Sequence, residues 1–424
     1  MGERFGRSAR CHAERSEASV PIPAFGPFAE RRLTTSQPQP SAHLARFADT
    51  SRANRARGTP IHRDDQPLPL NLAEYESAAA ALLPKAVYDY VAGGAGDEVT
   101  LRDNRAAFDR WRLLPRVMTG AGAPRLATTV LGQPTSMPVL TAPSAFHRLA
   151  HPDGELASAA AARRADVIYT MSTAATHPIE AVAPRAGRWW FQLYVYRDRG
   201  VTRELVARAE AAGASALVVT VDTPVVGRRE ADERNRFALP EGLGFANFAR
   251  PAERDLDTTA AGSALGAYSQ FEPVLRWTDL DWLASSTRLP VLPKGILAPD
   301  DARLALDHGA RGIVVSNHGG RQLDSAVAAL DALPAVAAAV DGRCELLLDG
   351  GVRRGVDVLK ALALGARAVT IGRPIHWGLA LGGEDGLVRL LELLRAEIAL
   401  ALQLAGLDDV TRIDRSLVVP AGPI

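Results

Sequence analysis

Short apolar runs of β-strand length recur eight times along the chain, each followed by a polar or glycine-containing turn and an alanine-rich helical stretch. The runs are Val139–Ala142, Val167–Met171, Trp189–Tyr194, Ala216–Val221, Val291–Leu292, Gly312–Val315, Glu345–Leu348 and Ala368–Ile371. Continuous apolar runs, rather than alternating ones, are typical of strands buried on both faces of a parallel sheet. Eight successive β/α units predict an α/β fold whose sheet closes into a single (β/α)8 barrel, the TIM-barrel architecture.

The segments outside these repeats differ in composition. Residues 1–66 combine Arg, Ser, Ala and Pro without a hydrophobic period, which predicts a disordered tail; a translation start placed too far upstream would explain it equally well. Residues 67–424 form the predicted barrel domain, which opens with helices beginning near Leu72 and Pro84. The long interval between the fourth run and Val291 is rich in Pro, Gly and Asp, and we predict that it is an active-site lid.

The bulk composition excludes several classes of protein. With 47% hydrophobic residues, 23% charged residues and a net charge of +1, the chain has no overall attraction to nucleic acid or to an anionic membrane. Its two cysteines, Cys11 and Cys344, argue against a structural disulfide and exclude a cysteine-rich zinc site. No apolar run reaches the roughly 18 residues of a membrane span, and the first residues lack a secretory pattern. We therefore expect a cytoplasmic protein without a membrane span.

Polar side chains or glycines stand at the end of all eight runs or just after it. They are Ser144, Ser172, Gln192 with Tyr194, Thr220 with Asp222, Lys294, Ser316 with His318 and Arg321, Asp349-Gly350-Gly351, and Gly372-Arg373. One or two such residues would mean little, because turns are polar in general. In a (β/α)8 barrel, however, the carboxyl ends of all strands meet on the face that carries the active site. We therefore expect these residues to converge on a site for a cofactor and a substrate.

Some of these positions indicate particular chemistry. His318 and Arg321 follow the same run and can bring a titratable base and a carboxylate-binding fork to one small ligand. Lys294 is predicted to face the barrel interior, where its ammonium group needs an anionic partner such as a flavin, a phosphate or a carboxylate. The loops after the last two runs combine glycines with Arg353 and Arg373, at the corner where such barrels bind phosphate. Histidines without such neighbours are expected to be packing or capping residues: His12, His43, His62, His151, His308 and His376.

Six blocks of sequence resemble one known family in their order and spacing. The blocks are Phe191–Tyr196, Thr220–Pro224, Gly227–Asp232, Ser316–Gln322, Asp349–Gly355 and Ile371–Pro374. From Leu72 to Ile413 the chain resembles the FMN-dependent α-hydroxy-acid oxidases and dehydrogenases, which include glycolate oxidase, lactate oxidase, mandelate dehydrogenase and hydroxymandelate oxidase. The Ser-Asn-His-Gly-Gly-Arg-Gln block is highly specific for that family. The resemblance implies FMN as the cofactor and a small 2-hydroxy acid as the substrate.

The resemblance also implies roles for individual residues. His318 matches the catalytic base, and Asp222 matches the carboxylate that orients it and stabilises its protonated form. Tyr194 matches a tyrosine that contacts the substrate hydroxyl, and Lys294 matches the lysine beside the N1/O2 edge of the flavin. The residues that match the binding site for the substrate carboxylate are Tyr90, Arg229 and Arg321. The implied cofactor contacts are Pro143, Ser144, Ala145, Ser172, Gln192 and Thr220 at the ring, Ser316 near it, and Asp349, Gly350, Gly351, Arg353, Gly372 and Arg373 at the ribityl chain and phosphate.

The implied reaction has two halves. His318 takes a proton while two electrons pass from the substrate α-carbon to FMN, giving a 2-keto acid, and O2 or another electron acceptor then reoxidises the flavin. The proton removed, the substrate and the acceptor (oxidase or dehydrogenase) stay open. Ala174 replaces a tryptophan of plant glycolate oxidases, which predicts a roomier pocket suited to lactate-like or mandelate-like acids. The resemblance further implies a homotetramer.

Three alternatives account for part of the pattern. A Schiff-base aldolase would use Lys294 as its nucleophile but would leave His318 and Arg321 without a role. A metal-dependent hydrolase would require more converging ligands than His318, Asp222 and Asp349. A catalytically inactive flavin-binding module is disfavoured by the full set of catalytic residue types. Separately, a proline directly before Lys294 removes a donor from the ladder and is expected to reshape the fifth strand slightly.

Overall fold

The computed structural model describes residues 68–248 and 271–422. The predicted tail lies outside these ranges, as do residues 249–270 of the predicted lid. The described part of the predicted lid contains two helices, α8 (Glu230–Arg234) and α10 (Trp277–Ser286), and one turn of 3-10 helix, η2 (Ala246–Phe248).

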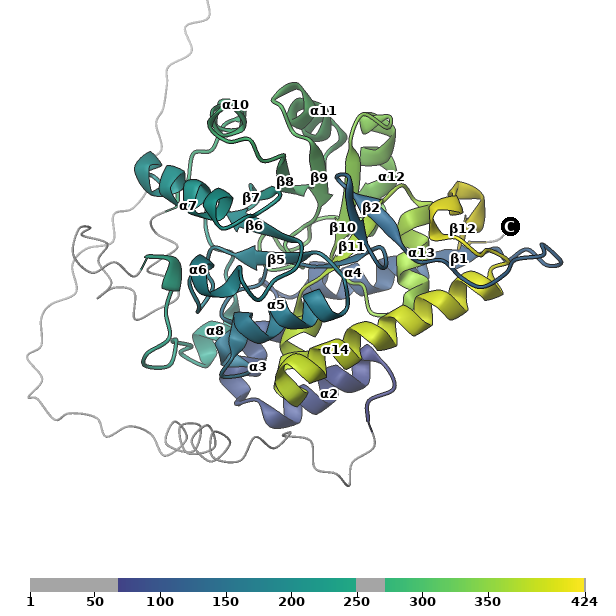
Figure 1. Ribbon diagram of the computed structural model, residues 1–424, viewed down its shortest axis with the longest axis horizontal. Helices are drawn as coiled ribbons and strands as arrows, with labels where there is room; N and C mark the ends of the chain where they lie inside the picture. The colour runs from purple at the N-terminus through teal and green to yellow at the C-terminus, as the bar shows by residue number, and fades with distance from the viewer. Residues whose placement is uncertain (1–67, 249–270, 423–424) are drawn as a thin grey trace, which may run out of the picture. The chain divides into compact units, whose positions relative to one another are not determined.

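Eight parallel strands form the centre of the fold (Figure 1). They are β4 (Val139–Thr141), β5 (Tyr169–Ser172), β6 (Trp189–Leu193), β7 (Leu217–Thr220), β8 (Val291–Ile296), β9 (Gly312–Val315), β10 (Glu345–Asp349) and β11 (Ala368–Ile371). Their order is β4-β11-β10-β9-β8-β7-β6-β5, and the paired neighbours are parallel. Between β5 and β4, the Thr141 N–H donates to the Ile168 carbonyl at 3.2 Å and the Thr170 N–H donates to Thr141 Oγ1 at 2.9 Å. The predicted (β/α)8 barrel is therefore confirmed.

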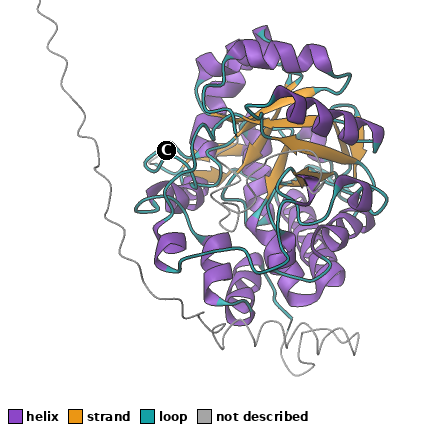
Figure 2. Cartoon of the chain, turned by 90° about the vertical axis from the view of Figure 1, so that its left-hand side faces the viewer, coloured by secondary structure: helices purple, strands orange, loops and turns teal. Residues whose placement is uncertain are grey.

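Helices surround the strands (Figure 2). Those that follow the barrel strands are α5 (Gly154–Arg164), α6 (Ile179–Val182), α7 (Arg199–Ala211), α10 (Trp277–Ser286), α11 (Pro299–Asp307), α12 (Ala329–Val340), α13 (Gly355–Ala363) and α14 (Arg373–Leu404). Before the barrel lie α2 (Leu72–Leu82), α3 (Lys85–Ala92) and α4 (Val99–Asp109), and α2 packs along α14. The two predicted N-terminal helices are thus present: the side chain of Asn71 caps α2, and α3 ends at Gly93.

Two small antiparallel ladders lie outside the barrel sheet. β1 (Trp111–Leu113) pairs with β12 (Val418–Pro420), and β2 (Thr128–Val130) pairs with β3 (Gln133–Thr135). The β2–β3 hairpin covers the amino-terminal end of the barrel: Val130 packs into the interior cluster, and Trp190 Nε1 donates to Gln133 Oε1 at 3.4 Å. The remaining 3-10 turns are η1 (His147–Leu149), η4 (Val410–Arg412) and η5 (Arg415–Leu417).

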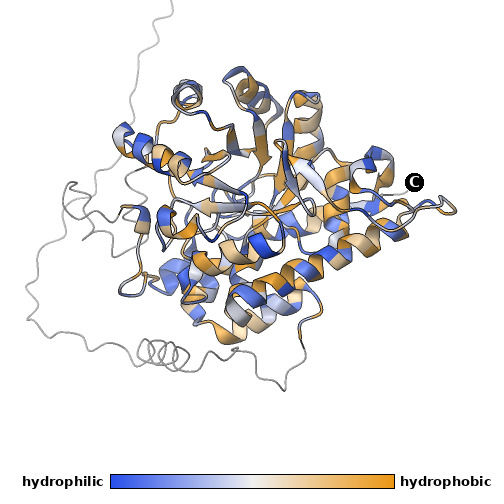
Figure 3. Cartoon of the chain, viewed as in Figure 1, coloured by the Kyte–Doolittle hydropathy of each residue, from blue (hydrophilic) through white to orange (hydrophobic). Residues whose placement is uncertain are grey.

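The barrel interior changes from apolar to polar along the strands. Its apolar cluster contains Leu140, Ile168, Trp190, Val218, Leu292, Val314, Leu347 and Ala368. Two positions further along β6 to β11 stand polar residues, namely Gln192, Thr220, Lys294, Ser316, Asp349 and Thr370. Side chains two apart on a strand share a face, so the polar layer lies directly above the apolar one. In Figure 3 the surrounding helices show both hydrophobic and hydrophilic sides, as expected for helices packed on a sheet.

β8 is longer than the sequence predicted. The expected run ends at Leu292, whereas the strand continues to Ile296. Pro293 lies within the ladder to β7, and the ladder to β9 shifts register between Lys294 and Ile296. The irregularity expected from the proline is therefore present just beyond it. Pro, Lys and Gly are poor strand formers, which is why this part of the strand was missed.

The contact between Gly351 and α4 can be tested by substitution. Gly351 has φ +79°, and an added Cβ would lie 2.1 Å from the Asn104 carbonyl oxygen. We expect Gly351→Ala to lower the free energy of unfolding by about 2–4 kcal/mol, because backbone strain and overpacking each cost about 1–3 kcal/mol. Gly213→Ala is the control: Gly213 has φ +86° but no atom within 4 Å of an added Cβ. We expect it to lose about 1–2 kcal/mol in denaturant unfolding, and equal losses in the two variants would contradict the packing argument.

Candidate active site

A cleft opens at the carboxyl ends of the barrel strands. The sequence-predicted residues that line it are Tyr90, Pro143, Ser144, Ala145, Ser172, Gln192, Tyr194, Thr220, Arg229, Lys294, His318, Arg321, Asp349, Gly350, Gly351, Arg353, Gly372 and Arg373. Asp222 and Ser316 stand behind this lining, in hydrogen-bond contact with His318 and Lys294 respectively. The fold therefore brings all the predicted site residues together.

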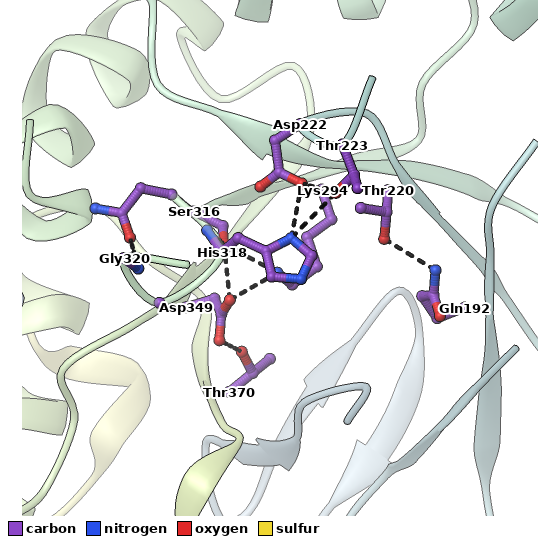
Figure 4. Close-up of polar contacts among 12 residues, drawn as sticks. Gln192, Thr220, Asp222, Thr223, Lys294, Ser316, His318, Gly320, Asp349 and Thr370 are labelled. Atoms are coloured by element: carbon purple, nitrogen blue, oxygen red, sulfur yellow. Dashed lines mark hydrogen bonds and ion pairs between the residues drawn. The ribbon is translucent and has the colours of Figure 1, made fainter. Parts of the chain in front are cut away.

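His318 and Asp222 form a polar pair at the cleft (Figure 4). Nδ1 of His318 lies 2.8 Å from Oδ1 of Asp222. The backbone of His318 is left-handed, with φ +58°, and its N–H donates to Ser316 Oγ at 3.0 Å. Burial acts to raise the pKa of Asp222, but His318 and Lys294 outweigh it, so the pKa is lowered. An ionised carboxylate accepts only, so the proton shared by this pair lies on Nδ1 and the imidazole is held in one orientation.

The approach of Asp222 to the barrel depends on Gly295. An added Cβ at Gly295 would lie 2.5 Å from Cβ of Asp222, and its φ of +122° suits glycine alone. Thr223 supports the same carboxylate, donating from Oγ1 to Oδ1 of Asp222 at 3.2 Å. The register irregularity in β8 therefore creates the space in which the carboxylate sits.

Lys294 is held in a buried network with Asp349 (Figure 4). Its Nζ lies 2.8 Å from Oδ2 of Asp349 and donates to Ser316 Oγ at 3.0 Å. Ser316 and Thr370 donate to the two carboxylate oxygens of Asp349 at 2.7 and 2.9 Å. Burial lowers the pKa of Lys294, but Asp349 and Asp222 more than compensate and raise it. Burial likewise acts to raise the pKa of Asp349, yet Lys294 and the two hydroxyls lower it. The anionic partner expected for Lys294 is thus Asp349, and both groups are charged.

Gln192 connects the polar residues of three neighbouring strands. Its Oε1 accepts from Ser172 Oγ and from the Thr173 N–H, both at 3.1 Å. Its Nε2 donates to Thr220 Oγ1 at 3.0 Å. Ser172, Gln192 and Thr220 consequently form a fixed row of hydrogen-bonding groups along one side of the cleft.

Two arginines approach the ring of Tyr90. The guanidinium carbons of Arg229 and Arg321 lie 5.5 and 5.1 Å from its centroid. Arg229 pairs with Asp232 at 3.3 Å, and Arg321 donates to the Tyr90 carbonyl at 2.8 Å. Phe237 stacks on Tyr90 with ring centroids 4.4 Å apart. Two forked cations on one rigid aromatic side chain make a suitable site for a small carboxylate.

Tyr194 faces this group from β6's end. It stacks on Phe271 with centroids 4.1 Å apart and an interplanar angle of 14°. Burial raises the pKa of Tyr194, and the negative charge of Asp222 raises it further, so the phenol stays protonated and can donate a hydrogen bond.

Buried positive charge gathers around Arg353 and Arg373, and Arg321 lies close by, since Nη1 of Arg321 and Nη2 of Arg373 both donate to the Gly93 carbonyl, at 2.9 and 3.0 Å. Burial lowers the pKa of Arg353 to about 10 and that of Arg373 to about 9, and Arg321 adds to the effect on Arg373. Gly350 and Gly351, with φ +115° and +79°, bring backbone close to the same corner. Desolvated cations beside glycine backbone favour an anion such as a phosphate group.

Sequence reasoning missed several residues of the site. Thr370 lies within β11 and bonds to Asp349, whereas the residues predicted at this strand, Gly372 and Arg373, both follow the run. The two-residue period from Ala368 would have identified it. Asn104 and Asn317 form a reciprocal pair of 2.8 Å hydrogen bonds behind the His318 loop, and their separation of 213 positions left no local signal. His376, expected to be a packing residue, is buried but also lines the cleft.

The roomier pocket expected at Ala174 is not supported by the structure. Ala174 is 1% exposed and does not line the cleft. Its carbonyl accepts from the Phe146 N–H at 3.1 Å, and Phe146 packs edge-on against Phe245 at 5.2 Å.

Two kinds of feature, a membrane-spanning helix and a cluster of metal ligands, are absent from the described residues. Within 68–248 and 271–422, no helix has the length and apolar character needed to cross a membrane. The same ranges hold no cluster of three or more His, Cys, Asp or Glu side chains suited to a metal ion. The candidate ligands of a metal hydrolase have other partners, since His318 bonds to Asp222 and Asp349 pairs with Lys294.

Known proteins of similar sequence and structure are named as oxidases of 2-hydroxy acids. The chain is 50% identical over 357 residues to L-lactate oxidase from Nostoc sp., covering 82% of this chain and 98% of that protein. It is 49% identical over 356 residues to human 2-hydroxyacid oxidase 1, covering 81% and 95%. A crystal structure of mandelate oxidase with (S)-4-hydroxymandelic acid has a TM-score of 0.79 and 46% identity, covering 83% of this chain and 99% of that one.

The cleft also fits the cofactor of these proteins. FMN is a phosphate dianion joined by a polar chain to a ring with hydrogen-bonding edges, and the cleft joins buried arginines to a row of polar side chains. The FMN-dependent dehydrogenase family matches residues 79–420. The chain therefore belongs to the FMN-dependent dehydrogenase family and is an oxidoreductase that acts on the CH–OH group of 2-hydroxy acids.

Proposed function

We propose that the protein oxidises a lactate-like or mandelate-like L-2-hydroxy acid to the 2-keto acid, with His318 as the base and O2 as the final electron acceptor. The observation that carries the proposal is the 2.8 Å pair between His318 and Asp222, which shares one cleft with Arg229, Arg321 and Tyr90. A base and a carboxylate site at one location are what the oxidation of a 2-hydroxy acid requires.

The arginines would fix the substrate. Arg229 and Arg321 hold its carboxylate through paired N–H groups, which sets the direction of the α-carbon as well as supplying charge. Tyr90 completes this carboxylate site, and the protonated Tyr194 donates to the substrate hydroxyl. The charge of the two guanidiniums also favours an acid over a neutral alcohol.

His318 would take the substrate proton on Nε2, because Nδ1 is directed at Asp222. The proton comes from the α-carbon or from the hydroxyl, the other hydrogen would leave with the two electrons to the cofactor, and both routes require a neutral imidazole. Asp222 then stabilises the imidazolium, much as a carboxylate does in other His–Asp pairs. The proton remains on His318 until solvent removes it.

The other cleft residues would hold the cofactor. Bound FMN supplies the two-electron acceptor for this reaction. Ser172, Gln192 and Thr220 bond to its ring, and Lys294 places positive charge at the ring edge. Arg353 and Arg373 bind the phosphate, together with backbone from Asp349–Gly351 and from Gly372. Pro143, Ser144 and Ala145, which line the cleft just after β4, would face the ring, and Ser316 keeps Lys294 in place.

Different observations support O2 as the electron acceptor and argue against an aldolase. Relatives and structural neighbours are named as oxidases, which favours O2 with H2O2 as the second product. Lys294 has a raised pKa and is paired with Asp349, so its amine stays protonated and is a poor Schiff-base nucleophile.

Anaerobic reduction tests the function directly. The yellow holoenzyme should lose its visible absorption with L-lactate or L-mandelate, and after air is admitted it should regain its colour with one H2O2 per keto acid. Bleaching that persists in air would replace O2 by another acceptor. A protein that cannot take up FMN, or that no 2-hydroxy acid reduces, would contradict the proposal.

The role of Asp222 can be tested with an amide. Asp222→Asn should slow anaerobic reduction on the order of 100- to 10,000-fold, because the imidazolium loses its counter-charge while the carboxylate site is retained. FMN content should be unchanged. Asp300→Asn, at an exposed carboxylate on α11, is the control and should reduce at the wild-type rate. Wild-type reduction by Asp222→Asn would remove Asp222 from the mechanism.

The pH profile gives a further test. Because the base must be unprotonated to accept the substrate proton, kcat/KM should decrease along an acid limb of the pH profile. Steady-state rates measured in overlapping buffers from about pH 8 to about pH 5 would show this limb. A value of kcat/KM that does not decrease at acid pH, with FMN fully bound, would contradict a base that must be unprotonated.

A further inference from the structure

The segment after β4 makes a tight turn with a strained backbone. Phe146 adopts left-handed dihedral angles, φ +59° and ψ +50°, which residues other than glycine rarely adopt. Its N–H donates to the Ala174 carbonyl at 3.1 Å, and the His147 N–H donates to Glu155 Oε1 at 3.0 Å. Residues 143–145, just before the turn, line the cleft. The position of this part of the cleft wall therefore depends on the contacts that hold the turn.

His376 holds the turn from α14. It is 4% exposed, and its Nε2 lies 3.1 Å from the Ala145 carbonyl oxygen. A carbonyl only accepts, so Nε2 carries the hydrogen, and burial lowers the pKa of His376 to about 3, which keeps the ring neutral. Its Nδ1 is buried and has no hydrogen-bond partner within the described residues. An apolar side chain would fill the space without an unpaired nitrogen, so the Nε2 donor is what histidine adds here.

His147 holds the same turn from the other side. Its Nε2 lies 2.7 Å from Ser144 Oγ, and its Nδ1 lies 2.8 Å from Ser158 Oγ on α5. The Ser158 hydroxyl also lies 3.2 Å from the Glu155 carbonyl oxygen and 3.3 Å from the Tyr169 hydroxyl, so the His147 ring joins Ser144 to Ser158 in either tautomer. Burial lowers the pKa of His147 to about 3 as well. The rings of His147 and His376 meet edge to face, with centroids 5.0 Å apart.

We propose that His147 and His376 are a pair of positioning residues that fix Ser144 and Ala145 against the FMN bound in the cleft. His376 lies one helical turn after Arg373 on α14. The same turn of helix therefore carries Arg373, which we place at the phosphate, and the hydrogen bond from His376 to the Ala145 carbonyl. The pair thereby sets the distance between the phosphate end of the cleft and the wall beside the ring. This inference rests on the proposed placement of FMN and adds two residues to which sequence motifs assigned no cofactor role.

The side chains predict a specific pattern of variants. His376→Leu keeps the volume but removes the donor to Ala145, so FMN should dissociate about 10-fold more readily and reduction should slow about 10-fold. The KM for the hydroxy acid should change little, since Arg229 and Arg321 bind elsewhere in the cleft. His376→Gln, whose amide N–H reaches about as far as imidazole Nε2, should restore most of both losses.

The experiment compares these two holoenzymes with wild type. FMN release is followed by the fluorescence of free flavin on dilution, the ring environment by the visible spectrum, and chemistry by stopped-flow anaerobic reduction with L-lactate or L-mandelate. His308→Gln is the matched control: this histidine pairs with Asp281 at the end of α11, away from the cleft, and should leave all three readouts at wild-type values. Circular dichroism checks that each variant is folded.

The outcomes separate the inference from the proposed function. Loss of FMN affinity in His376→Leu with recovery in His376→Gln supports the positioning pair. Equal behaviour of the two variants would make His376 a packing residue and overturn it. If His376→Leu does not fold, His147→Leu and His147→Gln decide by the same comparison. A wild-type enzyme that no hydroxy acid reduces would refute the proposed function. The rate of FMN release from the variants would still test whether His147 and His376 position the cofactor site.

Discussion

The two-residue period of the β-strand is the constraint on which this site depends. From β6 to β11, each interior apolar residue is followed two positions later by a polar one, as with Leu292 and Lys294 or Leu347 and Asp349. Closure of the sheet then turns these separate positions into two stacked layers. A register slip of one residue would turn Lys294 and Asp349 out into the helix layer, where neither charge has a partner. Fold and site therefore share one geometric requirement.

Some of the charged side chains at the cleft have a partner of opposite charge among the described residues and others do not. Lys294 is matched by Asp349, and Asp222 faces His318, so these groups are held in place before any ligand arrives. Arg353 and Arg373 are different, because burial lowers their pKa values and neighbouring guanidiniums add to the strain on Arg373. An anionic cofactor relieves this excess of positive charge. Binding of FMN should therefore also stabilise the fold.

Much of the architecture could be predicted because a strand buried on both faces has a continuous apolar signature. The runs containing Gly312–Val315 and Ala368–Ile371 were found with the observed bounds. The predicted β8 was too short because Pro293, Lys294 and Gly295 have low strand propensity. Pairing with β7 and β9 overrides that local preference. Thr370 was missed for a related reason, since its role depends on position within a strand rather than beyond it. The sequence motifs identified many of the residues that line the cleft, but not Val226 or His376, and the roles of the identified residues stay predictions.

By itself, the sequence determined the number and order of the β/α units and the chemical types gathered at their ends, because both are written in local patterns and short motifs. The tertiary structure alone decided which groups meet. Asp349 as partner of Lys294, and the reciprocal Asn104–Asn317 pair, join segments far apart in the chain. The turn that places His376 against Ala145 is equally non-local. Such contacts depend on how the closed barrel brings helices and strand ends together. A local sequence period carries no information on which distant segments meet.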